Sequence, residues 1–501
     1  MLRNIGSNWV LILVTIGATY LITPFVIHAL GKEGYGTWTL ITSMTGYMSL
    51  LALGVPAACV RYLTQYVAQS DSGKMNQAIG SCAGLYLIVG GAAAAIGAVL
   101  TMVFALYDIP SAFQAEATLA FALMVLTVSG GFIGLLPEGI MFAHHDFILR
   151  NLVRVSGVLL RLGLTLGLLM LHASLVVLAA IQLACLAFDF GVSWLLITRR
   201  YPEVRISLSD FDRGMVRHIF SFSLYVLLLN AGARLSFETD AIVIGAFMGV
   251  ASIPFFAVAN SLVVYLMEFM VAIAAVVAPM VTKLNTDGNL VLLRETFLKW
   301  SKIALSLTMV AGLFLAVLGP RFLGWWIDPS FEGPAGAVLQ ILVISSLVFL
   351  PVRAVALPVL IGLGKPRTPA IALAAAGVLN LGLSIVLIGP FGLAGVALGT
   401  AIPNILFAVF VLAIACRELE ISLPNYLKYV VPRATVGAVP VLALLLWFRL
   451  GLRVESIFGL ITAGSVMVLV FGITCIFFVY RNDPYVNLRM HLVRRRAWSR
   501  A

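Results

Sequence analysis

Residues 9–30, WVLILVTIGATYLITPFVIHAL, decide the fold because they contain no Asp, Glu, Lys or Arg. As an α-helix this stretch would be about 33 Å long, enough to cross a hydrocarbon core about 30 Å thick. It lacks the small-residue cleavage site of a secretory signal peptide. We therefore expect it to stay in the protein as the first membrane span.

The rest of the chain has a similar composition. Hydrophobic residues make up 61% of the 501 residues and charged residues only 11%, and the mean hydropathy is +1.07. An ordinary soluble domain carries about 25% charged residues. Strands of a membrane barrel would alternate in hydrophobicity over about 10 residues, and the sequence has no such pattern. Helices are the remaining way to satisfy this much backbone in lipid.

The apolar runs predict an all-α polytopic membrane protein with about fourteen transmembrane helices. The predicted spans start near Trp9, Thr37, Gly80, Thr118, Leu152, Ser174, His218, Ile253, Trp300, Pro334, Thr368, Gly392, Val431 and Ser456. The net charge of +11 does not indicate nucleic acid binding, because the basic residues are scattered between apolar runs. With a cytoplasmic N-terminus, about 25 of the 32 Lys and Arg residues lie inside and about four outside. We therefore predict a multi-pass protein with both termini in the cytoplasm.

The two halves of the chain show a faint internal repeat with an offset of about 220 residues. Three places correspond: Gly31 with Gly249, the Asp71-Ser72-Gly73 turn with Asp287-Gly288-Asn289, and Leu136-Pro137 with Leu357-Pro358. Chance similarity among apolar helices is the alternative. A repeat of six spans keeps its orientation, so it predicts two lobes related by an axis along the membrane normal, with a substrate path between them.

This repeat divides the chain into four predicted parts. They are an N-terminal six-helix lobe (1–205), a C-terminal six-helix lobe (206–416), two additional transmembrane helices (417–480) and a basic cytoplasmic tail (481–501). The first two parts form a parallel repeat, and the two additional helices have no counterpart in it.

Motifs for catalysis, nucleotides or metals are missing from the sequence. GLGKPR, starting at Gly362, lacks the first glycine of a phosphate loop and has Pro366 where Ser or Thr should follow the lysine. We therefore predict that the protein is not an enzyme and has no metal or cofactor, with Na+ or H+ coupling left open. We interpret the five cysteines as packing residues, because none shows CxxC spacing: Cys59, Cys82, Cys185, Cys416 and Cys475.

Charged residues inside the predicted spans each need a partner, a water-filled cavity or a function, since burial at bilayer depth costs at least about 2.5 to 3.5 kcal/mol. Folding the hairpins about their loops places Glu138 near the depth of Arg154, and Arg161 near that of Asp189. We interpret these four residues as two structural ion pairs.

The predicted seventh span concentrates charge in LNAGARLSFETDAIVIGAF, residues 229–247. Arg234 and Glu238 are spaced i, i+4 and can neutralise one another. The other interpretation is a solvated cavity in which Arg234 meets a substrate anion. Asp240 or Glu268 would then titrate or hold a cation, since Glu268 lies at a depth comparable to Arg234 across the hairpin.

Two further arginines are candidate substrate contacts. Arg353 has no acidic partner at matching depth, although Asn380 is a candidate partner across the following hairpin, and Arg61 lies at the inner end of the second span. The guanidinium fork suits a pyrophosphate because it donates two charge-assisted hydrogen bonds at once. The spans nevertheless hold more acids than arginines, which favours ion coupling or a cationic substrate.

Two segments resemble a known family, the polysaccharide transporters or lipid-linked oligosaccharide flippases of the multidrug/oligosaccharidyl-lipid/polysaccharide exporter superfamily. ALGKEGYGTWTLITSMTGYMSLLALGVPAACVRYL (29–63) is similar to that family's first loop and second span, and TDAIVIGAFMG (239–249) to its seventh. The resemblance implies two lobes around a central cavity that alternates between inward-open and outward-open states. It also implies that Arg234 and Arg61 contact phosphate groups and that Asp240 takes part in gating or ion coupling.

The resemblance further implies an undecaprenyl-pyrophosphate-linked oligosaccharide as cargo, a location in the bacterial inner membrane, and a role in O-antigen, lipopolysaccharide, capsule or exopolysaccharide biosynthesis. The partners would be this lipid-linked oligosaccharide, membrane lipids, and a polysaccharide polymerase and chain-length regulator. Two alternatives stay open. One is a cation-coupled multidrug or metabolite exporter of the same superfamily, and the other is a scaffold subunit of an envelope assembly complex that transports nothing.

Overall fold

The computed structural model describes residues 2–52, 54–104, 107, 109–216, 231–232, 234–235, 238–452 and 456–486. The regular elements in these ranges are all helical. The chain forms two compact units, Met1–Pro254 and Phe255–Ala501. The beginning of the predicted seventh span and the tail from residue 487 lie outside the described residues.

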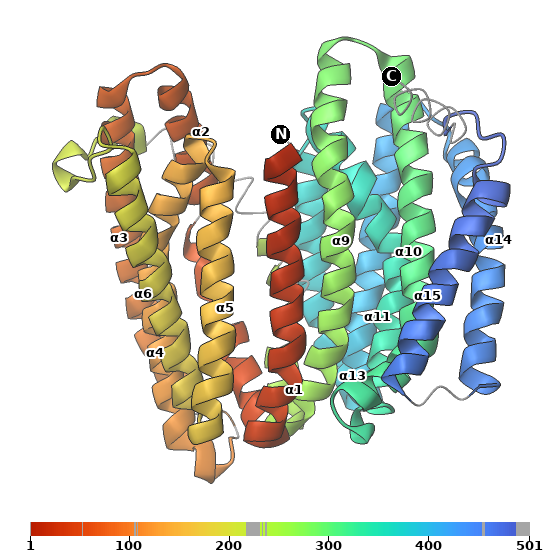
Figure 1. Ribbon diagram of the computed structural model, residues 1–501, viewed down its shortest axis with the longest axis horizontal. Coiled ribbons are helices and arrows are strands. Elements are labelled where there is room, and N and C mark those ends of the chain that lie inside the picture. Colours follow the sequence, from red (N-terminus) through yellow and green to blue (C-terminus); the bar gives the residue numbers. More distant parts are fainter. Residues whose placement is uncertain are drawn as a thin grey trace, which may run out of the picture. The chain divides into compact units, whose positions relative to one another are not determined.

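The first unit is built around long helices of the first six predicted spans. Its elements are α1 (Leu2–Tyr47), η1 (Met48–Ala52), α2 (Val55–Ala68), α3 (Ser72–Phe104), α4 (Ser111–Ala143), α5 (Phe147–Leu171), α6 (Leu175–Arg200), η2 (Leu208–Asp210), α8 (Thr239–Met248) and η3 (Val250–Ser252). Helix α4 packs against both α3 and α6, and α5 packs against α1 and α6 (Figure 1). Both α8 and η3 pack against α1, which explains why they belong to this unit.

The second unit holds the remaining helices. They are α9 (Ile253–Thr286), α10 (Leu290–Trp326), η4 (Pro329–Phe331), α11 (Pro334–Pro351), the π-helical turn η5 (Val352–Ala356), α12 (Leu357–Gly362), α13 (Arg367–Glu418), α14 (Leu423–Leu450), α15 (Ile457–Thr474) and the π-helical turn η6 (Cys475–Val479). Helices α10 and α11 are its centre, because 56% and 67% of their most apolar stretches are buried. The division of the chain into lobes at residue 205 stays a prediction.

Polar side chains mark where several of these helices begin. The first N–H groups of a helix have no partner within it, and a Ser or Asn side chain can accept a hydrogen bond from one of them. Ser174 accepts from the Val176 N–H at 3.2 Å at the start of α6, and Asn289 accepts from the Leu292 N–H at 3.0 Å at the start of α10. Ser456 begins α15 in the same way.

The span count agrees with the predicted fold class. Eleven helical segments within the described residues are long and apolar enough to cross a membrane. Two of them, containing α1 and α13, are interrupted by non-helical backbone at Gly31 and Gly392 and supply two spans each, which turns eleven into thirteen. The remaining predicted span starts near His218, outside the described residues, and ends in α8. The prediction of an all-α protein with about fourteen spans is thus confirmed.

Gly31 and Gly249, which the predicted repeat aligns, have the same unusual backbone conformation. Gly31 has φ 71° and ψ 178°, and Gly249 has φ 78° and ψ 163°. A positive φ favours glycine because a Cβ would clash with the backbone. The aligned Asp71 and Asp287 also occupy corresponding places, since each lies in the turn that precedes a long helix, α3 or α10. These matches support the internal repeat.

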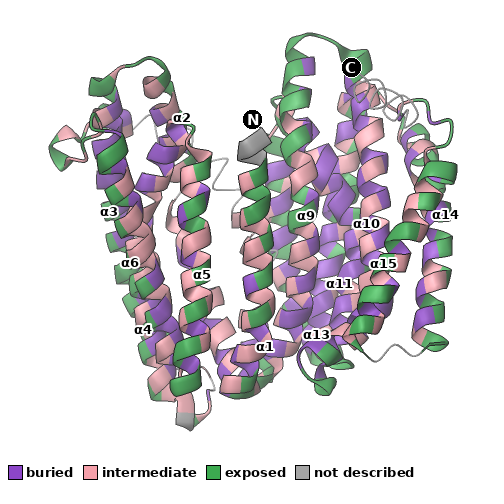
Figure 2. Cartoon of the chain, viewed as in Figure 1, coloured by how far each residue is buried: buried purple, intermediate pink, exposed green. Residues whose placement is uncertain are grey.

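The outward faces of the helices are apolar, as a membrane protein requires. Met102 is 76% exposed and Phe458 is 78% exposed. Figure 2 shows exposed residues along the outer sides of α3 and α15. Such extensive exposed apolar surface is not found on soluble monomers. Lipid chains would cover these side chains.

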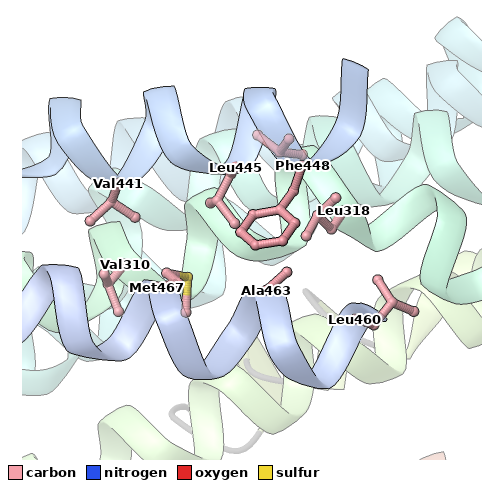
Figure 3. Packing of buried hydrophobic residues seen from close by; sticks show 9 residues of the cluster. Val310, Leu318, Val441, Leu445, Phe448, Leu460, Ala463 and Met467 are labelled. Carbon is pink, nitrogen blue, oxygen red and sulfur yellow. The ribbon is translucent and has the colours of Figure 1, made fainter. Parts of the chain in front are cut away.

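The two additional helices, α14 and α15, pack on α10 of the second unit. Val310 and Leu318 of α10 meet Val441, Leu445 and Phe448 of α14 and the Leu460, Ala463 and Met467 side chains of α15 (Figure 3). Lipid is as apolar as these side chains, so close van der Waals packing and not exclusion from water holds such helices together. Ala463 is fully buried, and its small side chain allows α15 to approach its neighbours.

Candidate functional site

Arg234 and Glu238 form an ion pair in the first unit, on the described part of the predicted seventh span. The NH1 group of Arg234 contacts Oε1 of Glu238 one helical turn away. About a third of each side chain is exposed, 32% for Arg234 and 33% for Glu238. The pair is therefore neither sealed in the core nor fully solvated, and the guanidinium fork carries five N–H donors in all.

Gly46, near the end of α1, allows this ion pair to lie against the helix. A Cβ atom at residue 46 would lie 2.8 Å from Oε2 of Glu238 and 3.2 Å from NH1 of Arg234. Any larger residue would have to displace the charged groups. Sequence reasoning missed Gly46 because nothing in the pattern of one span shows which residues of another span face it.

Tyr47 adds a polar contact beside the pair. Its hydroxyl donates to the Arg234 carbonyl oxygen at 3.2 Å and hydrogen-bonds the Thr239 hydroxyl. Asp240 is 97% buried next to Thr239 and is close enough to Tyr47 to act on it electrostatically. The structure thus brings three predicted site residues, Arg234, Glu238 and Asp240, together with the unpredicted Tyr47. We call these residues and Gly46 the Arg234 cluster.

Arg353 and Glu268 interact electrostatically in the second unit. The sequence assigned Arg353 no acidic partner, but Glu268 on α9 is close enough to act on its charge. Arg353 lies in the π-helical turn η5, with its guanidinium 5.9 Å from the centre of the Phe349 ring.

The suggested alternative partner, Asn380, donates instead to the Thr400 hydroxyl at 3.0 Å. Arg61 is exposed on α2, with its guanidinium 5.9 Å from the centre of the neighbouring Tyr62 ring. The match in depth between Arg234 and Glu268 stays a prediction, as do the assigned roles of all these residues.

Glu138 and Arg154 form the ion pair that their depths indicate. Arg154 donates from Nε to Oε1 at 3.1 Å and from NH2 to Oε2 at 2.7 Å. The pair lines a pocket of about 220 Å³ between α4, α5 and α6, together with Arg150, Asp189 and Ser193. The arginine thus holds the carboxylate with two parallel charge-assisted hydrogen bonds.

Asp189 does not form the predicted ion pair with Arg161. A Cβ on Gly157 of α5 would lie 2.3 Å from Oδ1 of Asp189, so the carboxylate rests against Gly157, one helical turn from Arg161. Its Oδ1 atom is buried without a hydrogen-bond partner, and Arg161 acts on it only electrostatically. Register across a hairpin depends on the loop conformation, which residue counting does not give.

Lys302 and Asp483 form a buried ion pair in the second unit that sequence reasoning missed. Their side chains are 1% and 0% exposed. Tyr429 donates to Oδ1 of Asp483 at 2.7 Å, and the Lys302 ammonium lies 4.8 Å from the Tyr429 ring centre. Neither residue occupies the middle of an apolar run: Lys302 lies near the start of a predicted span and Asp483 lies in the predicted basic cytoplasmic tail.

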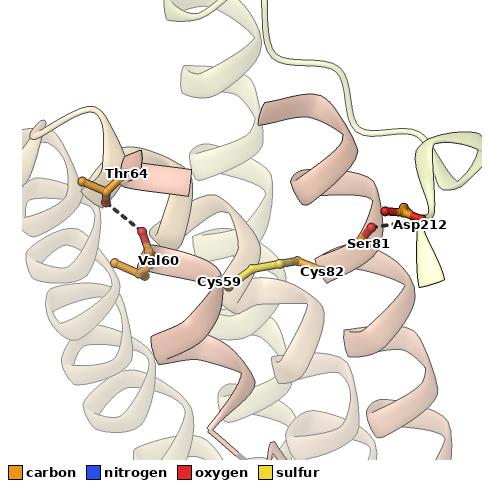
Figure 4. Close-up of a disulfide and its surroundings, with 6 residues drawn as sticks. All are labelled: Cys59, Val60, Thr64, Ser81, Cys82 and Asp212. Carbon is orange, nitrogen blue, oxygen red and sulfur yellow. Dashed lines mark hydrogen bonds between the residues drawn. A yellow bond between two sulfur atoms is a disulfide. The ribbon is translucent and has the colours of Figure 1, made fainter. Parts of the chain in front are cut away.

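A disulfide between Cys59 and Cys82 corrects the interpretation of all five cysteines as packing residues. It joins α2 to α3 across 23 residues, with a Cα–Cα distance of 6.3 Å. Figure 4 shows it beside the hydrogen bond from the Asp212 N–H to Ser81. The other three cysteines are free. Spacing gave no signal, because the pairing depends on how two helices pack.

Comparison with known proteins identifies relatives of this chain. The family described as "Polysaccharide biosynthesis protein" matches residues 1–285, which include the whole Arg234 cluster. The chain is similar to the membrane protein EpsK of Bacillus subtilis, with 24% identity over 87% of this chain and 86% of that protein. EpsK carries the description "uncharacterized".

Two kinds of solved structure share the fold. The lipid II flippase MurJ, in an inward closed conformation, superposes with a TM-score of 0.73 and 13% identity over 96% of this chain and 99% of that chain. An inward-facing multidrug resistance MATE transporter of the MOP superfamily gives a TM-score of 0.70 and 17% identity, over 82% of this chain and 98% of that one. The TM-scores show a common fold, and at identities this low the similarity extends to the fold alone.

Proposed function

The chain belongs to the polysaccharide biosynthesis protein family, and from this premise we propose that it is a flippase for lipid-linked oligosaccharides. Its cargo would be an undecaprenyl-pyrophosphate-linked repeat unit, carried across the bacterial inner membrane by alternating access. Both termini would be cytoplasmic, as the distribution of Lys and Arg predicts. A polysaccharide polymerase and a chain-length regulator would be its partners in the assembly of a surface polysaccharide.

The observation that carries the proposal is the partly open ion pair of Arg234 and Glu238. Moving a pyrophosphate through the membrane requires a cation that can replace the water around the phosphate oxygens. Arg234 has the donor geometry for this, and Glu238 contacts one of its NH groups. Gly46 leaves room for the pair beside α1, and the Tyr47 hydroxyl donates to the Arg234 carbonyl oxygen.

In the proposed cycle, the pyrophosphate takes the place of Glu238 beside Arg234. The displaced Glu238 carboxylate then needs a proton or a sodium ion, and Asp240 provides a second acidic group two residues further along the chain. This exchange would couple cargo binding to ion binding, since Glu238 would have to give up its proton or sodium ion before it could pair with Arg234 again and release the cargo. Within the second unit, Arg353 would be a further substrate contact and Glu268 a further ion-coupling group.

One observation favours the exporter alternative. The predicted spans hold five acids, Glu138, Asp189, Glu238, Asp240 and Glu268, against three arginines. The partnerless buried oxygen of Asp189 is the kind of group that a proton or cation would satisfy. A cation-coupled exporter would use such acids directly, without a pyrophosphate.

The discriminating experiment measures which molecule crosses the membrane. Purified protein in liposomes would receive a fluorescent undecaprenyl-pyrophosphate oligosaccharide, and an impermeant quencher would report the fraction in the outer leaflet. Protein-free liposomes and a fluorescent phosphatidylcholine would control for leakage and scrambling. The proposal expects rapid exchange of the oligosaccharide lipid alone. Gradient-driven transport of cationic drugs without lipid exchange would support the exporter, and no transport of either would support a scaffold.

A further inference from the structure

Helix α13 is a tight antiparallel hairpin. Its backbone turns at Gly392, and Asn380 on the first leg donates to Thr400 on the second at 3.0 Å. Both ends of the hairpin lie together, because Lys365, just before α13, pairs with Glu418 at its last residue. The two legs therefore share a continuous seam from the turn to the charged end.

Small side chains open this seam into a groove of about 430 Å³. On the first leg, Ala372, Ala375 and Ala376 line it, at the spacing that puts residues on one helical face. On the second leg, Leu406 and Phe410 form the opposing wall, and they are 54% and 50% exposed. Apart from Arg367 and Thr368 at one end, the residues that line the groove are apolar.

The length of the groove matches one leaflet of a bilayer. It runs from Arg367 to Leu379 along the first leg, which is about 18 Å at 1.5 Å per residue. Half of the hydrocarbon core is about 15 Å thick. A single hydrocarbon chain of a lipid, inserted from the end that carries Arg367, would fill it.

The mouth of the groove is positively charged. Arg367 lines the groove and is exposed, and no ion pair involving it occurs among the residues that the structure describes. The nearby Glu418 is already paired with Lys365. Arg417, at the end of the other leg, is also exposed but does not line the groove. The positive-inside distribution predicts that this end lies in the cytoplasmic leaflet, where anionic lipids attract basic residues.

From this geometry we propose that the α13 groove binds one anionic phospholipid, with an acyl chain in the seam and the headgroup phosphate on Arg367. The charge of the mouth selects an anionic over a zwitterionic headgroup, and the alanine floor selects a hydrocarbon chain over a polar ligand. The site is separate from the Arg234 cluster and does not depend on the proposed cargo.

Native mass spectrometry of the purified protein, titrated with phosphatidylglycerol or phosphatidylethanolamine, tests this proposal. Wild-type protein is expected to bind one phosphatidylglycerol molecule more tightly than any further molecules of that lipid. Arg367→Gln should weaken this binding by about tenfold, the value of a charge-assisted hydrogen bond. Ala375→Trp should fill the seam and remove the tight site. Arg417→Gln and Val386→Trp, at exposed positions of the same hairpin outside the groove, should bind like wild type.

Equal binding of the two lipids by wild type, or equal phosphatidylglycerol binding by Arg367→Gln and Arg417→Gln, would overturn the proposal. Displacement of phosphatidylglycerol by an equimolar amount of undecaprenyl phosphate would overturn the assignment to a phospholipid in favour of the prenyl carrier. Arg367 is exposed, so its variant is expected to fold even if the tryptophan variant does not.

Discussion

Lys302 and Asp483 form an ion pair in which both side chains are almost completely buried. The pair joins α10 to the segment that follows the last helix, and Tyr429 of α14 completes it. The backbone N–H groups of Tyr485 and Val486 also donate to Asp483, at 3.0 and 3.1 Å. The chain after the last span is thereby fixed to the second unit, and its first residues are not a solvated tail.

Removing one partner of this pair should destabilise the protein strongly. Lys302→Met leaves the buried Asp483 charge unpaired, which costs about 3 to 5 kcal/mol at comparable sites. We expect a clear drop in the thermal unfolding temperature in detergent. Lys365→Met, which breaks the largely exposed pair with Glu418, should cost at most about 1 kcal/mol. Equal effects of the two substitutions would contradict the burial of Lys302.

The composition of the chain was enough to predict the membrane fold, because each span carries its own apolar signal. The local pair of Arg234 and Glu238 was also predictable, since four residues make one helical turn. Contacts between spans that are distant in the sequence were not predictable in this way. Tyr47 lies 187 residues from Arg234 in sequence. The Asp189 carboxylate lies against Gly157, one helical turn from Arg161, with which it was predicted to pair. Lys302 was missed because burial of a charge at the end of a span depends on its neighbours.

Gly46 should be sensitive to even a small substitution. Gly46→Ala places a Cβ 2.8 Å from the Glu238 carboxylate, which has to move and take Arg234 with it. We expect slower transport of the oligosaccharide lipid with little change in unfolding temperature. Gly17→Ala on the same helix, where no atom lies within 4 Å of the added Cβ, is the matched control. Wild-type transport by Gly46→Ala would argue against a fixed position for the ion pair.

The disulfide predicts the number of reactive thiols. After denaturation without reductant, a maleimide should label three cysteines, Cys185, Cys416 and Cys475. Reduction before labelling should raise the number to five, since Cys59 and Cys82 are then released. The Cys59→Ser variant should give four labels in both conditions. Five labels on unreduced wild-type protein would show that the bond does not form.

Asp146 should contribute a pH-dependent part of the stability. It lies between α4 and α5 and accepts from Nε of Arg200 at 2.7 Å. This hydrogen bond, with that of Tyr201, lowers the pKa of Asp146 below its ordinary value. Its contribution is therefore present above the unfolded-state pKa of about 3.9 and disappears as the pH falls through the lower folded-state pKa.

Comparing Asp146→Asn with wild type between pH 7 and pH 3 measures this contribution. The variant should unfold at a lower temperature at pH 7, and the difference should shrink below about pH 4. Asp287→Asn, in the turn before α10 with no ion pair among the described residues, is the control. A difference that grows toward low pH would contradict the assigned pKa direction.

The central claim is that Arg234 binds the cargo and does not merely neutralise Glu238. Lipid exchange by Arg234→Ala, Glu238→Ala and the double variant in liposomes separates these roles, with folding checked by thermal unfolding. Our account predicts that Arg234→Ala slows exchange at least about tenfold, because charge-assisted hydrogen bonds to the pyrophosphate are lost. It also predicts that the double variant stays equally slow. Recovery of wild-type exchange in the double variant would show that Arg234 serves only as the partner of Glu238.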